Sequence, residues 1–221
     1  MKKKILLYIM AMVLLFTVVA GATFAYLFSN GNTIENVFEP SYIGDPAVTE
    51  TKTNFAITPG VSVAKDPTIT YKHDTTGDDV KYVLLYAVLD LEPTTSAWAM
   101  SSNKFTFTGG SSDTIDFTVN STYWTYVGKT AAGNYIYVYK TVLDGTVDSE
   151  AFPVISSNKV NVSAGWTESE LSSAFSNSKV QIKVGSFAAQ AQPTYSATGT
   201  TVTKANAQTI WNNCNSDTVS G

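Results

Sequence analysis

Apolar residues in this chain recur at every second position, and this spacing limits the fold more than any other feature. Four segments carry apolar side chains on one face at that period: Phe105/Phe107, Ile115/Phe117/Val119, Val160/Val162 and Val180/Ile182/Val184. The run Val80–Leu91 is apolar on both alternating faces, which predicts a central strand covered on each side. With turn residues between the runs, the pattern predicts an all-β protein of about eight to ten short strands.

A tyrosine-rich hairpin is predicted in the middle of the chain. Tyr123–Val127 and Tyr135–Tyr139 are two β-prone runs separated by a turn that contains Gly133 and Asn134, as expected for antiparallel neighbours. The aromatic rings would then pack against one another across the two strands. An alternative is an aromatic face that stacks on a sugar, made of Tyr123, Trp124, Tyr135, Tyr137 and Tyr139.

Helix signals are few. Thr167 and Glu170 form a capping box that predicts a short helix over 168–176. A second helix is predicted over 204–213, burying Ile210 and Trp211, whereas 93–102 and 190–203 are rich in turn residues and predict loops. The pattern over 41–221 favours a jelly-roll-like or immunoglobulin-like β-sandwich with one or two short helices.

The first 25 residues have the form of a cleavable signal peptide. Three lysines, Lys2–Lys4, precede the uncharged 17-residue run Ile5–Gly21, and small residues then predict cleavage between Ala25 and Tyr26. We therefore expect a secreted, extracellular protein at the cell surface that meets a signal peptidase during export. The alternative is an uncleaved anchor, which would be its one association with a membrane.

Composition and charge argue against several kinds of partner and chemistry. All 14 basic residues are Lys, and beyond residue 25 there are 11 Lys against 18 Asp and Glu, a net charge of −7. Without Arg and with this charge, nucleic acid is not an expected partner. His73 and Cys214 are the single His and Cys of the chain, which cannot build a Cys/His zinc cage or an intrachain disulfide. We expect no catalytic residue, metal or cofactor.

Three weaker features leave alternatives open. The acidic segment His73–Asp79 is either a solvated turn or a set of oxygen ligands for Ca²⁺, although it lacks the spacing of a calcium loop. Asp144, Asp148 and Glu150 form a second acidic group, which is either a solvated turn or a set of paired carboxylates as in a glycosidase, a reading that needs a cleft. Cys214 is either a small apolar filler beside Trp211 or an exposed thiol that links two subunits.

Several fragments, in order, resemble one family of secreted proteins. They are the leader end Gly21–Ser29, the stretch Asn32–Phe38, the pair Ile57–Gly60 and Lys65–Ile69, the run from Trp124 through Tyr135–Tyr139 to Val142-Leu143, and the closing Ala188–Ala191 with Ala205 and Trp211. Together they resemble the TasA/camelysin-like proteins, whose leaders are removed by a SipW-type signal peptidase. Asp144-Gly145-Thr146 departs from the family pattern, because it lacks the proline expected there.

The resemblance implies a structural role. Family members are jelly-roll-like subunits or accessories of extracellular fibres in the biofilm matrix, and they associate with their own kind or with a related matrix protein. In the fibre-forming members, the N-terminal strand of one subunit completes a sheet of the next. Carried over to this chain, residues 26–40 hold the donor strand, with Tyr26, Phe28, Ile34, Val37 and Phe38 as its apolar residues. The alternative is an edge strand within the same subunit.

Two rival functions follow from the same residues. A monomeric surface adhesin would use the aromatic hairpin as its binding face. A camelysin-like metallopeptidase is the third candidate, because camelysin gives the family a peptidase label. The sequence has no HExxH motif and a single histidine, whereas a two-His-one-carboxylate zinc site needs two. We therefore expect a protein that is not an enzyme.

Overall fold

The computed structural model describes residues 43–51, 56–75, 81–93, 97–108, 113–175 and 180–220. All of them fall within the unit Pro40–Gly221. Within these ranges, no helix is both long enough and apolar enough to cross a membrane.

The described residues are mostly strands, as the sequence predicts. The strands are β1 (Asp45–Thr49), β2 (Val63–Ala64), β3 (Thr68–Lys72), β4 (Tyr82–Glu92), β5 (Trp98–Ser101), β6 (Lys104–Thr108), β7 (Thr114–Thr118), β8 (Trp124–Thr130), β9 (Tyr135–Tyr139), β10 (Leu143–Asp144), β11 (Phe152–Pro153), β12 (Lys159–Val162), β13 (Gln181–Gln190) and β14 (Val219–Ser220). The helices are α2 (Glu168–Phe175) and α3 (Lys204–Cys214), with one 3₁₀ turn, η2 (Ser156–Asn158).

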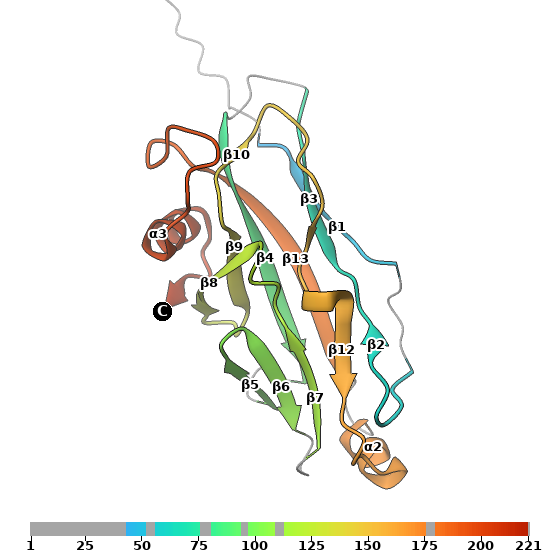
Figure 1. Cartoon of the computed structure of the whole chain (residues 1–221). Coiled ribbons are helices and arrows are strands. Elements are labelled where there is room, and N and C mark those ends of the chain that lie inside the picture. Colours follow the sequence, from blue (N-terminus) through green and yellow to red (C-terminus); the bar gives the residue numbers. More distant parts are fainter. Residues whose placement is uncertain are drawn as a thin grey trace, which may run out of the picture. The chain divides into compact units, whose positions relative to one another are not determined.

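The strands form three antiparallel sheets (Figure 1). One sheet has the order β10-β4-β9-β8-β14, and β13 also pairs with β4. Leu89 of β4 lies opposite Tyr135 of β9 and also opposite Val184 of β13, so these two neighbours flank β4 on opposite edges. The second sheet has the order β2-β12-β7-β6-β5, and the third has the order β1-β3-β11. The predicted central strand is confirmed in β4.

Two apolar cores cover the two faces of β4. Val83, Leu85 and Leu89 face a core shared with residues of β3, β6, β7 and β12, which is the interior of the sandwich. Leu84 and Tyr86 face a second core, which α3 closes with Ile210 and Trp211. The alternation of side chains along a strand sends odd and even positions of β4 to different cores. This explains why the run is apolar throughout and confirms an all-β sandwich.

Both predicted helices form at the expected places. In the capping box before α2, the Thr167 N–H donates to Glu170 Oε2 at 2.9 Å and the Glu170 N–H donates to Thr167 Oγ1 at 3.2 Å. Because the Thr167 N–H and hydroxyl both donate to it, the pKa of the Glu170 carboxyl is lowered. At α3, the hydroxyl of Thr203 accepts from the Asn206 N–H.

The predicted loop over 93–102 is partly wrong, because Trp98–Ser101 forms strand β5. The register places Trp98 opposite Phe107 of β6, and the two rings lie 5.4 Å apart between centroids. This cross-strand aromatic pair stabilises the pairing of β5 with β6. The serines around Trp98 gave no indication of that pairing. The short alternation Trp98/Met100 is the signal that could have revealed the strand.

Candidate functional site

The aromatic hairpin is built as predicted, but most of its rings lie inside the protein. β8 and β9 pair in register, with Trp124 opposite Tyr139 and Tyr126 opposite Tyr137. Trp124, Tyr135 and Tyr137 are only 1%, 5% and 0% exposed, whereas Tyr123 and Tyr139 are half-buried. A binding face needs exposed rings, and three of the five candidates are not exposed.

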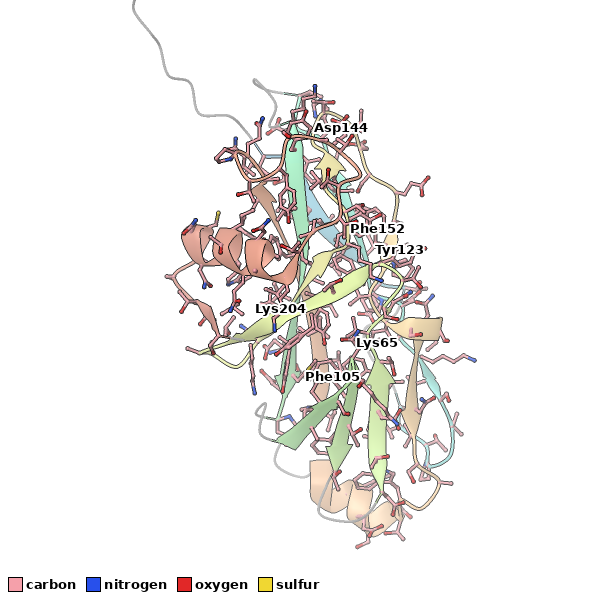
Figure 2. The ribbon with its side chains drawn as sticks, turned by 60° about the vertical axis from the view of Figure 1, so that its left-hand side comes forward. Lys65, Phe105, Tyr123, Asp144, Phe152 and Lys204 are labelled. Atoms are coloured by element: carbon pink, nitrogen blue, oxygen red, sulfur yellow. The ribbon has the colours of Figure 1, made fainter. Side chains whose placement is uncertain are left out.

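The contacts of these rings are those of core packing. Tyr135 meets Phe105 edge-on at 4.7 Å, and Tyr139 lies 4.2 Å from Phe152 between centroids. Figure 2 labels Phe152 and Tyr123, whose rings are 5.8 Å apart. The predicted cross-strand packing is confirmed by the pairs Trp124–Tyr139 and Tyr126–Tyr137, with ring centroids 6.1 and 5.3 Å apart. The sugar-stacking face keeps only Tyr123 and Tyr139 in partial contact with solvent.

The proposed cleavage site and donor strand lie outside the described residues. This applies to the bond between Ala25 and Tyr26 and to the apolar residues Tyr26, Phe28, Ile34, Val37 and Phe38. Their roles stay predictions. Strand donation also requires a surface on the described domain that accepts the added strand.

The outer edge of β13 is such a surface. β13 pairs with β4 along its whole length, from Gln181 opposite Glu92 to Gln190 opposite Val83. In the part of the chain that the structure describes, no strand pairs with the other edge of β13. β1 nevertheless lies alongside β13, and Ser186 Oγ donates to the carbonyl of Pro46 in β1 at 2.9 Å. Residues Gln181–Gly185, whose outer edge pairs with no described strand, are called the open edge below.

The direction of the backbone groups follows from one hydrogen bond at the end of β13. The Ala191 N–H donates to the carbonyl of Tyr82 at 2.8 Å, and antiparallel ladders alternate between bonded and outward-facing residues. Counting back by two residues, Gly185 turns its N–H and C=O toward β4, whereas Ile182 and Val184 turn theirs toward the open edge. Among the described residues these outward groups pair with no strand, although β1 lies alongside β13.

The side chains along the open edge report an incompletely closed core. Ile182 and Val184 pack against the sandwich interior but remain partly exposed. Their cross-strand partners in β4, Leu91 and Leu89, are 1% and 0% exposed. The core residues of β4 are thus buried, whereas those of β13 are partly exposed to solvent.

The Lys65-Asp66 pair, part of the motif that carries the family resemblance, fastens β1 to the domain. Lys65 Nζ lies 2.7 Å from Glu50 Oε1, and the two side chains are 10% and 15% exposed. Asp66 accepts hydrogen bonds from the Thr51 N–H, at 3.1 Å, and from the Thr51 hydroxyl. The Thr51 hydroxyl and N–H hold the pKa of the Asp66 carboxyl below its ordinary value. This clamp fixes the part of the chain that directly follows the N-terminal segment.

The acidic residues near His73 accept hydrogen bonds from nearby N–H and hydroxyl groups of the chain. Asp148 Oδ1 accepts from the His73 N–H at 2.7 Å, and the His73 ring Nδ1 lies 3.2 Å from the carbonyl of Gly145. Asp144 accepts from the N–H and hydroxyl of Thr146, which lowers the pKa of its carboxyl. Within the described ranges, which leave out 76–80, no three His, Cys, Asp or Glu residues gather as metal ligands.

Cys214 is exposed at the end of α3. The interpretation as an apolar filler beside Trp211 is therefore wrong, because the space next to the indole is occupied by Tyr86 and Phe187, with ring centroids 5.4 and 5.3 Å away. A link between two subunits through this thiol stays a prediction.

Comparison with models of protein families, with curated proteins and with solved structures gives no match to this chain. The family resemblance therefore rests on the sequence fragments alone. The open edge is the functional candidate that sequence reasoning missed. Its side chains were read correctly as a half-buried strand, but alternation does not say whether one or both edges of a strand are paired.

Proposed function

We propose that this protein is a secreted structural protein, a subunit or accessory of an extracellular surface fibre or biofilm matrix, assembled by donation of its N-terminal strand. The observation that supports the proposal is that, among the described residues, no strand pairs with the outer edge of β13, where Ile182 and Val184 remain partly exposed. Sheet edges of this kind pair readily with an extended segment of another chain.

The donor is the segment that signal cleavage would release. Tyr26 and Phe28 would lie at a new N-terminus, followed by Ile34, Val37 and Phe38. These apolar residues gain free energy when water is excluded from them. Before cleavage, the apolar leader is attached to Tyr26 and blocks its insertion into a sheet. Export and assembly would thus be coupled through one cut.

Electron microscopy of the exported chain, Tyr26–Gly221, tests this proposal. We expect regular filaments about one domain wide, and their loss when residues 26–40 are deleted. A sharper pair of variants is Phe28→Asp, which places a charge at an apolar donor position, and Ser29→Asp, which adds the same charge at a neighbouring polar one. Filaments should be lost in Phe28→Asp and retained in Ser29→Asp.

Other outcomes identify the rivals. Persistently monodisperse particles across concentration and pH would contradict self-assembly and favour an adhesin. Zinc-dependent, chelator-sensitive proteolysis by the purified chain, lost in His73→Ala, would favour the peptidase. Filaments that survive deletion of residues 26–40 would refute strand donation while leaving a fibre role intact.

A further inference from the structure

We propose that two tyrosines and two lysines, Tyr126, Lys129, Tyr135 and Lys204, form a binding site for a carboxylated sugar of an acidic polysaccharide. These four residues are called the lysine–tyrosine cluster below. They lie on β8, on β9 and at the start of α3. The inference goes beyond the proposed function and does not depend on strand donation.

A β-bulge in β8 brings its lysine onto the face that carries the tyrosines. Tyr126 lies opposite Tyr137, and Lys129 lies opposite Tyr135. The register shifts between Tyr126 and Gly128. Residues three apart on a regular strand point to opposite faces. The extra residue of the bulge therefore turns Lys129 to the face of Tyr126, and bulges near binding sites commonly re-aim a side chain in this way.

Both ammonium groups of the cluster lie over aromatic rings. Lys129 Nζ is 4.8 Å from the centroid of the Tyr135 ring, and Lys204 Nζ is 5.5 Å from the centroid of the Tyr126 ring. Among the described residues neither lysine forms an ion pair, although acidic residues outnumber lysines 18 to 11 beyond residue 25. The ring holds each ammonium in place and leaves its N–H donors for an anion.

The hydroxyl groups of the two tyrosines are also available to a ligand. Within the described ranges, neither hydroxyl has a hydrogen-bond partner, and the one buried polar side-chain atom without a partner is Trp98 Nε1. Both hydroxyls therefore reach solvent. Burial and the neighbouring Tyr135 phenol raise the pKa of the Tyr126 hydroxyl. This hydroxyl stays protonated at neutral pH and can donate a hydrogen bond to an anion.

Lys204, which is labelled in Figure 2, lies where it does not favour its helix. It is the first residue of α3, and the first turn of α3 has no acidic residue. A cation at this end opposes the helix dipole, whereas an anion would be stabilised there. The lysine therefore adds to the positive potential of the helix end. Binding of an anion explains this placement, and the stability of the helix does not.

The chemistry of the cluster matches a sugar that carries a carboxylate. The two ammonium groups supply charged donors for the carboxylate, and the phenol hydroxyls supply neutral partners for the adjacent sugar hydroxyls. The half-buried ring of Tyr126 offers an apolar surface to the C–H groups of a sugar ring. Nucleic acid fits less well, because the chain has no arginine for bidentate contacts with phosphate.

Calorimetric titration of the exported chain with a galacturonic acid tetramer tests the site. We expect Lys129→Gln and Lys204→Gln each to raise the Kd by about tenfold, since each removes a charged hydrogen-bond donor. Tyr126→Phe keeps the ring and removes the hydroxyl, and should raise the Kd by about fivefold. The matched control is Lys159→Gln in β12, which removes the same charge from an exposed lysine outside the cluster and should leave the Kd unchanged.

Two comparison ligands test the chemical class, namely the matching galactose tetramer and a hexapeptide of glutamate. We expect both to bind at least about tenfold more weakly than the galacturonic acid tetramer, because one lacks the carboxylate and the other lacks the sugar ring. Equal binding of the galactose tetramer would show that the carboxylate plays no part. Equal binding of the peptide would show that the cluster recognises negative charge alone. Either result would refute an acidic sugar as the ligand.

The remaining outcomes test the location of the site. No binding of the galacturonic acid tetramer, an unchanged Kd in both cluster lysine variants, or an equal loss in Lys159→Gln would refute the cluster as the site. Lys204→Gln should keep the Tm of the unchanged chain, because it removes a charge that opposes the helix dipole. A marked fall in its Tm would show that Lys204 serves stability and would refute this explanation of its position. None of these measurements requires filaments, so the proposed function is tested separately.

Discussion

Removal of Lys65 should destabilise the domain through the partner that it leaves behind. Lys65 Nζ and the Glu50 carboxylate are 2.7 Å apart, and both side chains are nearly enclosed. In Lys65→Met, the ionised carboxylate would remain in a poorly hydrated place. Breaking a buried ion pair in this way costs about 3–5 kcal/mol. Because both groups keep some contact with solvent, we expect the lower end, about 3 kcal/mol of unfolding free energy.

The double variant separates the ion pair from the loss of packing. Lys65→Met with Glu50→Leu removes both charges and keeps apolar volume, so we expect a cost of about 1 kcal/mol or less. Glu50→Leu alone takes this carboxylate away from the Lys65 ammonium and should cost nearly as much as Lys65→Met. The double variant should therefore cost about 4–5 kcal/mol less than the sum of the two single costs, and this difference is the coupling.

Thermal and urea unfolding of the four proteins would measure this coupling. For a domain of this size, 3 kcal/mol corresponds to a fall in Tm of about 6–12 °C. Additive effects of the two substitutions, or a fall in Tm below about 2 °C for Lys65→Met, would show that the pair contributes nothing. The ion pair between Lys65 and Glu50 would then not explain why the Lys65–Ile69 segment begins with a lysine.

Three further predictions concern other contacts. The Asp66 carboxyl has a lowered pKa in the folded protein, so its hydrogen bonds from Thr51 stabilise the fold fully at pH values above the ordinary pKa of 3.8. This stability is lost as the pH falls through the lowered pKa. Asp66→Asn should therefore flatten the acid side of a curve of Tm against pH. Tyr86→Phe removes the hydrogen bond from the buried hydroxyl to the Ala207 carbonyl, 2.9 Å long, and should cost about 1 kcal/mol, a fall in Tm of about 2–4 °C; an unchanged Tm would refute this. The exposed thiol of Cys214 should give a dimer band on non-reducing gels that Cys214→Ser abolishes; absence of the band would leave the thiol without a role.

The fold was predictable where a single periodicity decides the structure. The run Val80–Leu91 indicated β4 because a strand with two covered faces needs apolar residues at both its odd and its even positions. The capping box at Thr167 indicated α2 because its hydrogen bonds are local in sequence. In contrast, β5 was missed: its pairing depends on Trp98 meeting Phe107, and such a contact between two strands leaves little trace in a four-residue segment.

The candidate site was less predictable for a related reason. The aromatic residues of the hairpin could be placed on strands from the sequence. Which of their rings would be buried depended on Phe105 and Phe152, which come from other parts of the chain. The open edge of β13 is defined by missing backbone pairing, because β1 lies alongside it without pairing. Side-chain alternation carries no information about pairing along the hydrogen-bonding direction.

The sheet edges of this domain are protected in different ways. Soluble β proteins shorten their edge strands or place proline and charge on them, because a long free edge invites pairing with other chains. In this domain β2, β11 and β14 have two residues each, and prolines lie in two strands of the three-stranded sheet, Pro46 in β1 and Pro153 in β11. In β13, the charge of Lys183 lies beside Asp90 and Glu92, at a position whose backbone bonds to β4. The outward positions 182 and 184 carry Ile and Val, so neither charge nor proline protects this edge. β1 lies alongside it instead and is held to it by the bond from Ser186 Oγ to the Pro46 carbonyl, and a neighbouring segment that covers an edge protects it as charge and proline do.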